Sequence, residues 1–248
     1  MTLKQNYCGT ALRFIIPGFL LAVLIGIDYS SSVHAKNDLP AVKITAPKND
    51  STYKWNTRVN YNVVVSFQGK STQYQELPSN QVLLTATYVS DLSTVAGKPA
   101  PAAGGTPAGL LDIIRSNCLG CHEFNAKAMG PSFAAIAERY RQNPAAIDAV
   151  SGLIRGGSTG IWGPDSMPPH PELTDDQAHA IVLWIMKYAA DPNVSYYVGT
   201  EGAILMKAPG TPDSKAGILL KASYTSSAPT ANAAQAPYGE DAVILHGN

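Results

Sequence analysis

The stretch "SNCLGCHEFNAKAMGPSF", residues 116–133, places two cysteines with two residues between them and a histidine directly after the second. Cys118, Cys121 and His122 in this spacing can form a redox dithiol, half of a zinc site or an attachment point for haem. The third cysteine of the chain, Cys8, lies near the N-terminus and gives no second cysteine pair. The chemistry of this stretch therefore decides how the surrounding residues are interpreted.

The N-terminal residues predict where the protein goes. Two basic residues precede an apolar run at 14–27, and Ala35 ends a pattern of small residues typical of a signal-peptidase site. We expect residues 1–35 to be a secretory signal peptide, with a retained N-terminal anchor as the alternative. Cleavage would remove Cys8, leave no stable membrane span and place the protein in the periplasm or at the cell surface. In such an oxidising compartment the two remaining thiols are a disulfide, a metal site or a covalent attachment point.

The charge of the chain bears on its partners. Lysine and arginine total 18, aspartate and glutamate also total 18, and no segment is strongly basic. We therefore expect no nucleic-acid binding.

Composition and periodicity divide the chain after the signal peptide into three folded parts. Residues 98–107 are rich in Pro, Ala and Gly, which predicts a linker. Apolar and polar residues alternate within 36–97, as at Tyr61, Val63, Val65 and Phe67, and this period of two predicts a small β-sandwich. Residues 191–248 show a similar pattern and predict a second, β-rich module.

Residues 108–190 instead show the periodicity of four short helices. Thr106 can cap the first helix with Pro107 at its first position, and a third helix can start at Asn143. Thr174 and Gln177 have the spacing of a capping box at the start of the last helix. We expect residues 106–190 to fold and bind their cofactor independently, as a mobile unit on the flexible linker.

The helical context separates the three interpretations of the cysteines. A redox dithiol normally follows a strand, whereas the residues before Cys118 are helical. A structural zinc site needs two further soft ligands at matching spacing. Haem uses all three residues, because Cys118 and Cys121 can form thioethers while His122 binds the iron from one side. The pattern therefore favours haem.

A haem iron has a second axial position, and five residues are candidates for it: Met129, Met167, His170, His179 and Met186. Met129 lies close to His122 in the sequence and cannot easily reach the opposite face. His179 and Met186 fall on the last helix, where packing explains them. Met167 lies in a loop rich in Pro and Gly, where its apolar side chain would otherwise be exposed, and we predict that it is the ligand.

The motifs "CLGCH", Gly130-Pro131, "IWGPDSMPPHPELT" and "IVLWIMKYA" together resemble a small bacterial class I mono-haem cytochrome c over residues 108–190. The resemblance implies an all-α domain around one covalent haem c, with Met167 Sδ opposite His122 Nε2. It also implies that the Pro131 carbonyl accepts the His122 Nδ1 proton.

The resemblance also implies that two further residues lie near the haem propionates. Trp162 would reach a propionate with its indole N–H. Family members often carry basic residues in this region, and here Arg155 is the available one, with Leu153 beside it.

The flanking segments resemble an immunoglobulin-like or PKD-like module and the β-strand tail found around cytochrome segments of extracytoplasmic sugar-dehydrogenase-type proteins. That resemblance suggests redox protein partners: a sugar or quinoprotein dehydrogenase as donor and a terminal oxidase as acceptor. The fold class expected is multidomain, with the cytochrome c domain between the two β modules.

The expected ligand set indicates electron transfer rather than catalysis. His122 and Met167 would fill both axial positions, so no site stays open for a substrate. Electrons would pass through an exposed edge rimmed by small and apolar residues: Ala126, Ala128, Met129, Pro168 and Pro169. Three alternatives stay open: an electron-accepting subunit of a dehydrogenase, a haem enzyme with a labile Met167, and a glycan- or partner-binding module with a subsidiary haem.

Overall fold

The computed structural model describes residues 39–95, 105–227 and 236–248. The predicted signal peptide and most of the predicted linker lie outside these ranges. Four short 3-10 helices are present among the described residues: η1 (Thr72–Tyr74), η2 (Ser79–Gln81), η3 (Leu92–Thr94) and η4 (Asn117–Gly120).

The first sheet is built around a strand with the predicted alternation. Every second residue of β3 (Arg58–Phe67) is buried, from Val59 to Phe67. Its partners are β1 (Ala41–Ala46), β4 (Lys70–Ser71) and β9 (Glu201–Leu205), all antiparallel to it. The predicted strands in this part of the chain are therefore confirmed.

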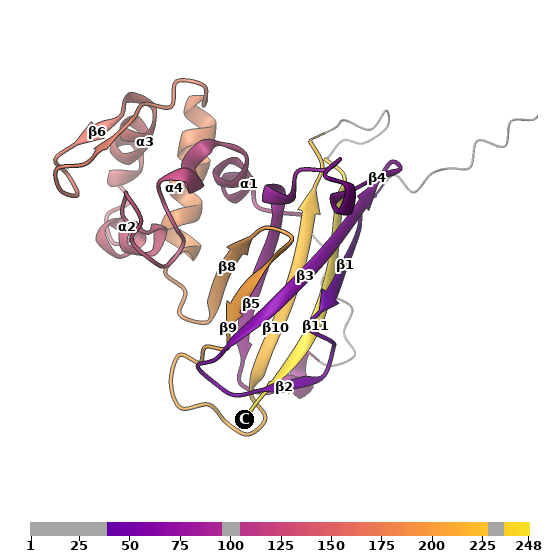
Figure 1. Cartoon of the computed structure of the whole chain (residues 1–248). Helices are drawn as coiled ribbons and strands as arrows, with labels where there is room; N and C mark the ends of the chain where they lie inside the picture. Colours follow the sequence, from indigo (N-terminus) through magenta and orange to yellow (C-terminus); the bar gives the residue numbers. More distant parts are fainter. Residues whose placement is uncertain (1–38, 96–104, 228–235) are drawn as a thin grey trace, which may run out of the picture. The chain divides into compact units, whose positions relative to one another are not determined.

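A second sheet of five strands packs on the first (Figure 1). Its order is β2 (Ser51–Tyr53), β11 (Tyr238–Gly247), β10 (Gly217–Thr225), β5 (Val82–Val89) and β8 (Val194–Val198). Val65 of the first sheet and Leu84 and Leu220 of the second are fully buried in one shared core. The two sheets thus form a β-sandwich.

The division of the β residues into two modules, 36–97 and 191–248, is wrong. β9 pairs with β3, and both β8 and β10 pair with β5, so strands from the two segments alternate within common sheets. Both neighbours of β5 come from the C-terminal segment, so without that segment the backbone N–H and C=O groups of β5 would lack their sheet partners. The helical segment is inserted between β5 and β8, which are neighbours in the sheet.

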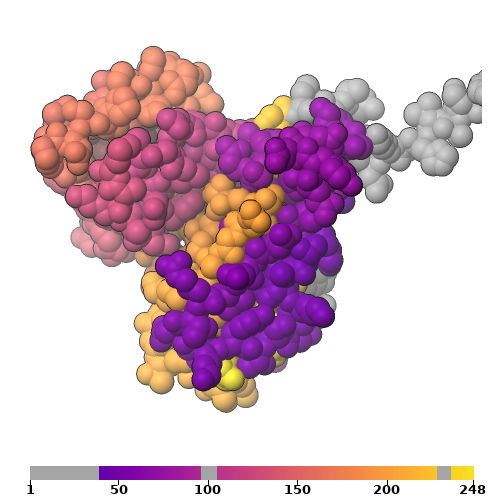
Figure 2. All heavy atoms as spheres, in the orientation of Figure 1, coloured from indigo at the N-terminus to yellow at the C-terminus, as the bar shows by residue number. Residues whose placement is uncertain are grey.

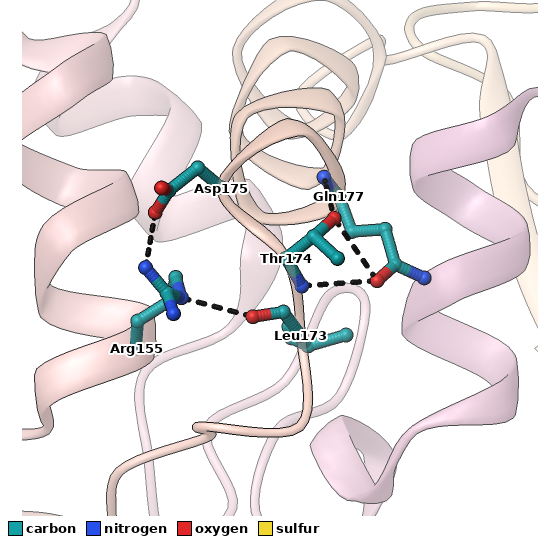
Figure 3. A network of polar contacts seen from close by, with 5 residues as sticks. All are labelled: Arg155, Leu173, Thr174, Asp175 and Gln177. Atoms are coloured by element: carbon teal, nitrogen blue, oxygen red, sulfur yellow. Dashed lines mark hydrogen bonds and ion pairs between the residues drawn. The ribbon is translucent and has the colours of Figure 1, made fainter.

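The four predicted helices are present: α1 (Ala108–Arg115), α2 (Phe133–Tyr140), α3 (Ala146–Gly156) and α4 (Asp175–Tyr188). The capping box between Thr174 and Gln177 is formed (Figure 3). Thr106 is not the N-cap of α1. Pro107 occupies that position, and the Thr106 hydroxyl accepts a hydrogen bond from Thr225 instead. Likewise, α3 begins at Ala146 rather than at Asn143.

The helices share their core with one face of the second sheet. Leu84 of β5 faces the sandwich core, whereas its neighbour Leu83 is buried among the helices. Tyr196 and Val198 of β8 pack against the same helical core. Alternate residues of a strand point to opposite faces, so β5 and β8 each contribute side chains to both the sandwich core and the helical core. The described helices and strands all belong to one compact unit, Ala35–Asn248.

In the described parts of the chain, we find no helix with the length and apolar character needed to cross a bilayer.

Candidate functional site

A cavity of about 490 Å³ lies within the helical segment. Six of the seven residues predicted for the site line it: Cys118, Cys121, His122, Pro131, Trp162 and Met167. The seventh, Arg155, does not. The segments that contribute the lining carry the magenta to salmon colours in Figure 2.

Cys118 lies in the short helix η4, and Cys121 follows that helix directly as its C-cap. Cys118 is buried, Cys121 is half-buried, and both are free cysteines. Ser116 Oγ lies 3.0 Å from Cys118 Sγ. Burial raises the pKa of the Cys118 thiol, mainly because the thiolate would lose contact with water. Both thiols are placed to bond a group that fills the cavity.

The imidazole of His122 is buried and held at one nitrogen. Its Nδ1 lies 2.6 Å from the carbonyl oxygen of Pro131. A carbonyl can only accept, so Nδ1 donates and Nε2 is left as the nitrogen that can bind iron. The ring of Phe133 stacks on the imidazole with centroids 5.4 Å apart. A Cβ on Gly130 would lie 2.5 Å from His122 Cε1, so this close packing requires glycine.

Met167 is held on the cavity wall by a two-stranded ladder. It belongs to β7 (Ser166–Met167), which pairs with β6 (Ser158–Thr159) so that Ser158 lies opposite Met167. Gly157 precedes this ladder with a φ of +78°, and a Cβ there would lie 2.9 Å from the Met167 carbonyl oxygen. The backbone around Met167 is therefore closely packed, although it lies in the Pro- and Gly-rich loop predicted from the sequence.

Trp162 has a cationic neighbour that the sequence analysis missed. The guanidinium carbon of Arg139 lies 4.6 Å from the centroid of the Trp162 ring, and Arg139 donates a hydrogen bond of 3.0 Å to the Ile161 carbonyl. Lys127 also lines the cavity. Arg139 comes from α2, more than 20 residues before Trp162, and the only signal for it in the sequence is a basic residue in the last turn of that helix.

Arg155 has a different role from the one predicted. Its Nε donates to the Leu173 carbonyl at 2.9 Å, and its guanidinium forms an ion pair with Asp175 (Figure 3). These contacts join the end of α3 to the start of α4. The carboxylate in the first turn of α4 thus engages the side chain that was expected at a propionate.

The lining residues fit a covalently attached haem. Two free thiols, a histidine with its Nδ1 already engaged and a thioether side chain all line one cavity. Much of the remaining lining is apolar, as at Phe133, Ile136, Ile181 and Ile185. The size of the cavity lies within the range of small-molecule and cofactor sites.

Comparison with known proteins agrees with this interpretation. The cytochrome c family model matches residues 112–189. Cytochrome c-552 of Nitrosomonas europaea is 35% identical over 95 residues, which cover 38% of this chain and 92% of that protein. Cytochrome c-552 of Hydrogenobacter thermophilus is 36% identical over 72 residues, or 29% of this chain and 72% of that protein.

A solved structure gives a similar alignment. The crystal structure of wild-type Nitrosomonas europaea cytochrome c552 aligns with 31% of this chain and 94% of its own length, at 36% identity and a TM-score of 0.30. The motif Cys118-x-x-Cys121-His122 within such a domain implies covalently bound haem c. By the family model and the relative from Nitrosomonas europaea that is covered over 92% of its length, the chain belongs to the cytochrome c family.

Proposed function

We propose that this chain is an extracytoplasmic mono-haem cytochrome that carries single electrons between a dehydrogenase and a respiratory acceptor. The observation that carries the proposal is that Cys118, Cys121, His122 and Met167 line one cavity. Bound haem supplies a one-electron couple between ferric and ferrous iron. The residues of the chain would attach the haem covalently, bind its iron and exclude water from it.

In this proposal Nε2 of His122 and Sδ of Met167 would hold the haem iron. The hydrogen bond from His122 Nδ1 to Pro131 fixes the imidazole and increases the basicity of Nε2. The β6–β7 ladder and Gly157 hold the backbone of Met167. If both side chains hold the iron, no position would stay open for a substrate, so the site would favour electron transfer.

Trp162 and Arg139 are proposed to form the propionate side of the site. Trp162 lines the cavity, and Arg139 lies over its ring while also holding the Ile161 carbonyl. This cation takes the place that the sequence analysis gave to Arg155.

Electrons are proposed to enter and leave at the exposed edge near the thioethers. Its expected rim is exposed throughout: Ala126, Ala128, Met129, Pro168 and Pro169. Small and apolar rims suit brief docking with little dependence on salt, as in other low-area redox encounters.

The β-sandwich has the two-sheet architecture of immunoglobulin-like modules, which agrees with the proposed place in a sugar- or quinoprotein-dehydrogenase assembly. The predicted signal peptide supports a periplasmic or cell-surface location.

A spectroscopic experiment tests the axial pair. Purified holoprotein is oxidised, its visible spectrum is recorded, and ascorbate is then added. We expect a low-spin ferric spectrum with the weak long-wavelength band of a sulfur–iron bond, followed by complete reduction. A high-spin ferric spectrum that changes on adding cyanide or peroxide would instead favour the haem enzyme with a labile Met167.

Replacing the proposed sulfur ligand tests its effect on potential. Met167→His should keep six-coordinate iron but lower the midpoint potential by a substantial part of the roughly 0.8 V range that axial ligands set. Imidazole lacks the preference of a thioether for ferrous iron. Redox titration measures the shift. Met129→His is the matched control, since Met129 also lines the cavity but is 64% exposed, and its midpoint should stay near that of the parent. An unchanged midpoint in Met167→His contradicts the assignment.

Replacing Gly130 by alanine tests how closely the His122 imidazole is packed. In Gly130→Ala the added Cβ would meet the imidazole at 2.5 Å, and the ring must shift away from Pro131. We expect part of the ferric haem to become high-spin and the unfolding free energy to fall by about 1–3 kcal/mol. Visible spectroscopy and chemical denaturation measure these effects. Gly156→Ala, where the new Cβ meets nothing within 4 Å, should leave the spectrum unchanged.

A further inference from the structure

A series of aromatic rings leads from His122 to the β-sandwich. Phe133 stacks on the imidazole at 5.4 Å with an interplanar angle of 22°. Phe124 packs against Phe133, with centroids 5.6 Å apart, and Tyr196 packs against Phe124, at 5.3 Å. Tyr196 also meets Trp184 of α4 edge to face at 5.2 Å and 76°. The last ring of the series is therefore held from two sides.

Tyr196 differs from the other rings in where it comes from. It belongs to β8, beyond residues 112–189 that match the cytochrome c family. It lies on the face of the sheet that packs against the helical core, as do Val198 of β8 and Leu83 of β5. Burial raises the pKa of its phenol to about 12, so the side chain stays neutral and contributes as a packed ring.

The connection between α4 and β8 is short, which keeps Tyr196 close to the helices. α4 ends at Tyr188 and β8 begins at Val194, so only five residues join them. A second contact holds the other end of the helical segment, where Arg115 of α1 donates a hydrogen bond of 3.0 Å to the Thr225 carbonyl of β10. The helical segment therefore contacts the sandwich at both of its ends, and such contacts are not expected of the mobile, tethered unit predicted from the sequence.

The orientation of the imidazole depends on this support. The Pro131 carbonyl holds only Nδ1, so the face of Phe133 limits rotation of the ring about that hydrogen bond. Phe133 packs against Phe124, and Phe124 packs against Tyr196, so in a closely packed core a shift of one ring requires a shift of the next.

We propose that Tyr196 is a positioning residue for the haem site, which acts through Phe124 and Phe133 to hold the imidazole plane of His122. The inference rests on the proposed function, in which His122 is an axial ligand. It assigns to the β-sandwich a part in the redox centre, because one of its strands completes the packing behind the ligand.

The test uses the full-length holoprotein and proton NMR of its oxidised form. The shifts of the four haem methyl groups depend on the direction of the axial imidazole plane, so they report its orientation. Tyr196→Leu removes the ring, Tyr196→Phe keeps it without the hydroxyl, and Tyr197→Leu is the matched control. Tyr197 is the next residue of the same strand, but its ring packs on the sandwich core against Tyr61.

We expect Tyr196→Leu to change the pattern of methyl shifts and the midpoint potential, and Tyr196→Phe to restore both. Tyr197→Leu should lower the stability of the protein and keep the parental methyl pattern, which separates positioning from general loss of stability. If Tyr196→Leu does not accumulate as folded protein, Tyr196→Met is measured by the same criteria. Parental methyl shifts and potential in the variant that lacks the ring would overturn the proposal.

A measurement on the unaltered protein tests the proposed function separately from the role of Tyr196. With ¹⁵N-labelled histidine, the parent should show a His122 signal strongly shifted by the iron. Absence of that signal would reject His122 as a ligand and with it the proposed function. Its presence, together with unchanged shifts in Tyr196→Leu, would reject only the role of Tyr196.

Discussion

Replacing Cys118 and Cys121 together by alanine is expected to leave no covalently bound haem and a largely unfolded helical segment. Each thiol makes its own thioether, so without both the haem is extracted by acidic acetone. The cavity left behind measures about 490 Å³. At about 24 cal/mol per Å³, an empty cavity of that size costs about 12 kcal/mol as an upper estimate, since its mouth is open. That cost is comparable to the entire stability of a typical domain.

The measurements are acetone extraction and circular dichroism of the double variant. The β-sandwich has a separate core around Val65, Leu84 and Leu220, so strand signal should persist while helix signal is lost. Ser116→Ala is the matched control, because Ser116 Oγ touches Cys118 Sγ at 3.0 Å but forms no thioether. It should retain covalent haem. Haem that resists extraction in the double variant would refute the attachment through these cysteines.

Gly109→Val is expected to separate the first helix from the last. A Cβ on Gly109 of α1 would lie 2.0 Å from the carbonyl oxygen of Ala180 and 2.9 Å from the backbone nitrogen of Ile181, both in α4. Backbone atoms cannot move aside as a flexible side chain can, so the two helices must part. We expect the loss to exceed the usual 1–3 kcal/mol of overpacking, at roughly 4 kcal/mol or more.

Chemical denaturation followed through haem absorbance measures this loss. Gly152→Ala in α3 is the matched control, since its new Cβ meets nothing within 4 Å. That variant should gain up to about 1 kcal/mol from the higher helix propensity of alanine. Equal stability of the Gly109 variant and the parent would show that α1 and α4 do not cross at this glycine.

Local patterns in the sequence predicted many of the helices and strands and most residues of the site. The spacing of Cys118, Cys121 and His122 pointed to haem, because each residue type has one task in attaching it. The capping box at Thr174 and the alternation along β3 predicted their elements, since both depend on neighbours a few residues away. The resemblance to cytochromes c implied the contact with the Pro131 carbonyl, and the structure places that oxygen 2.6 Å from His122 Nδ1.

Side-chain partners across long sequence separations could not be predicted in this way. Arg155 and Arg139 are both basic residues in the last turns of helices, and the sequence does not distinguish them. Asp175 engages Arg155, while Arg139 lies over Trp162. Which arginine lies beside the cavity-lining Trp162 depends on how α2, α3 and α4 pack.

The sequence by itself determined the elements, the attachment motif and the helical segment, because these follow from periodicity and spacing over short stretches. Only the tertiary structure decided that strands from both ends of the chain share two sheets, that β5 and β8 pack against the helices and that Tyr196 contacts Phe124 in the helical core. The physical reason is that strand order and sheet faces are set by burial. Strand β5 pairs with β10 and shares one buried core with it, although their residues lie more than 100 positions apart in the sequence.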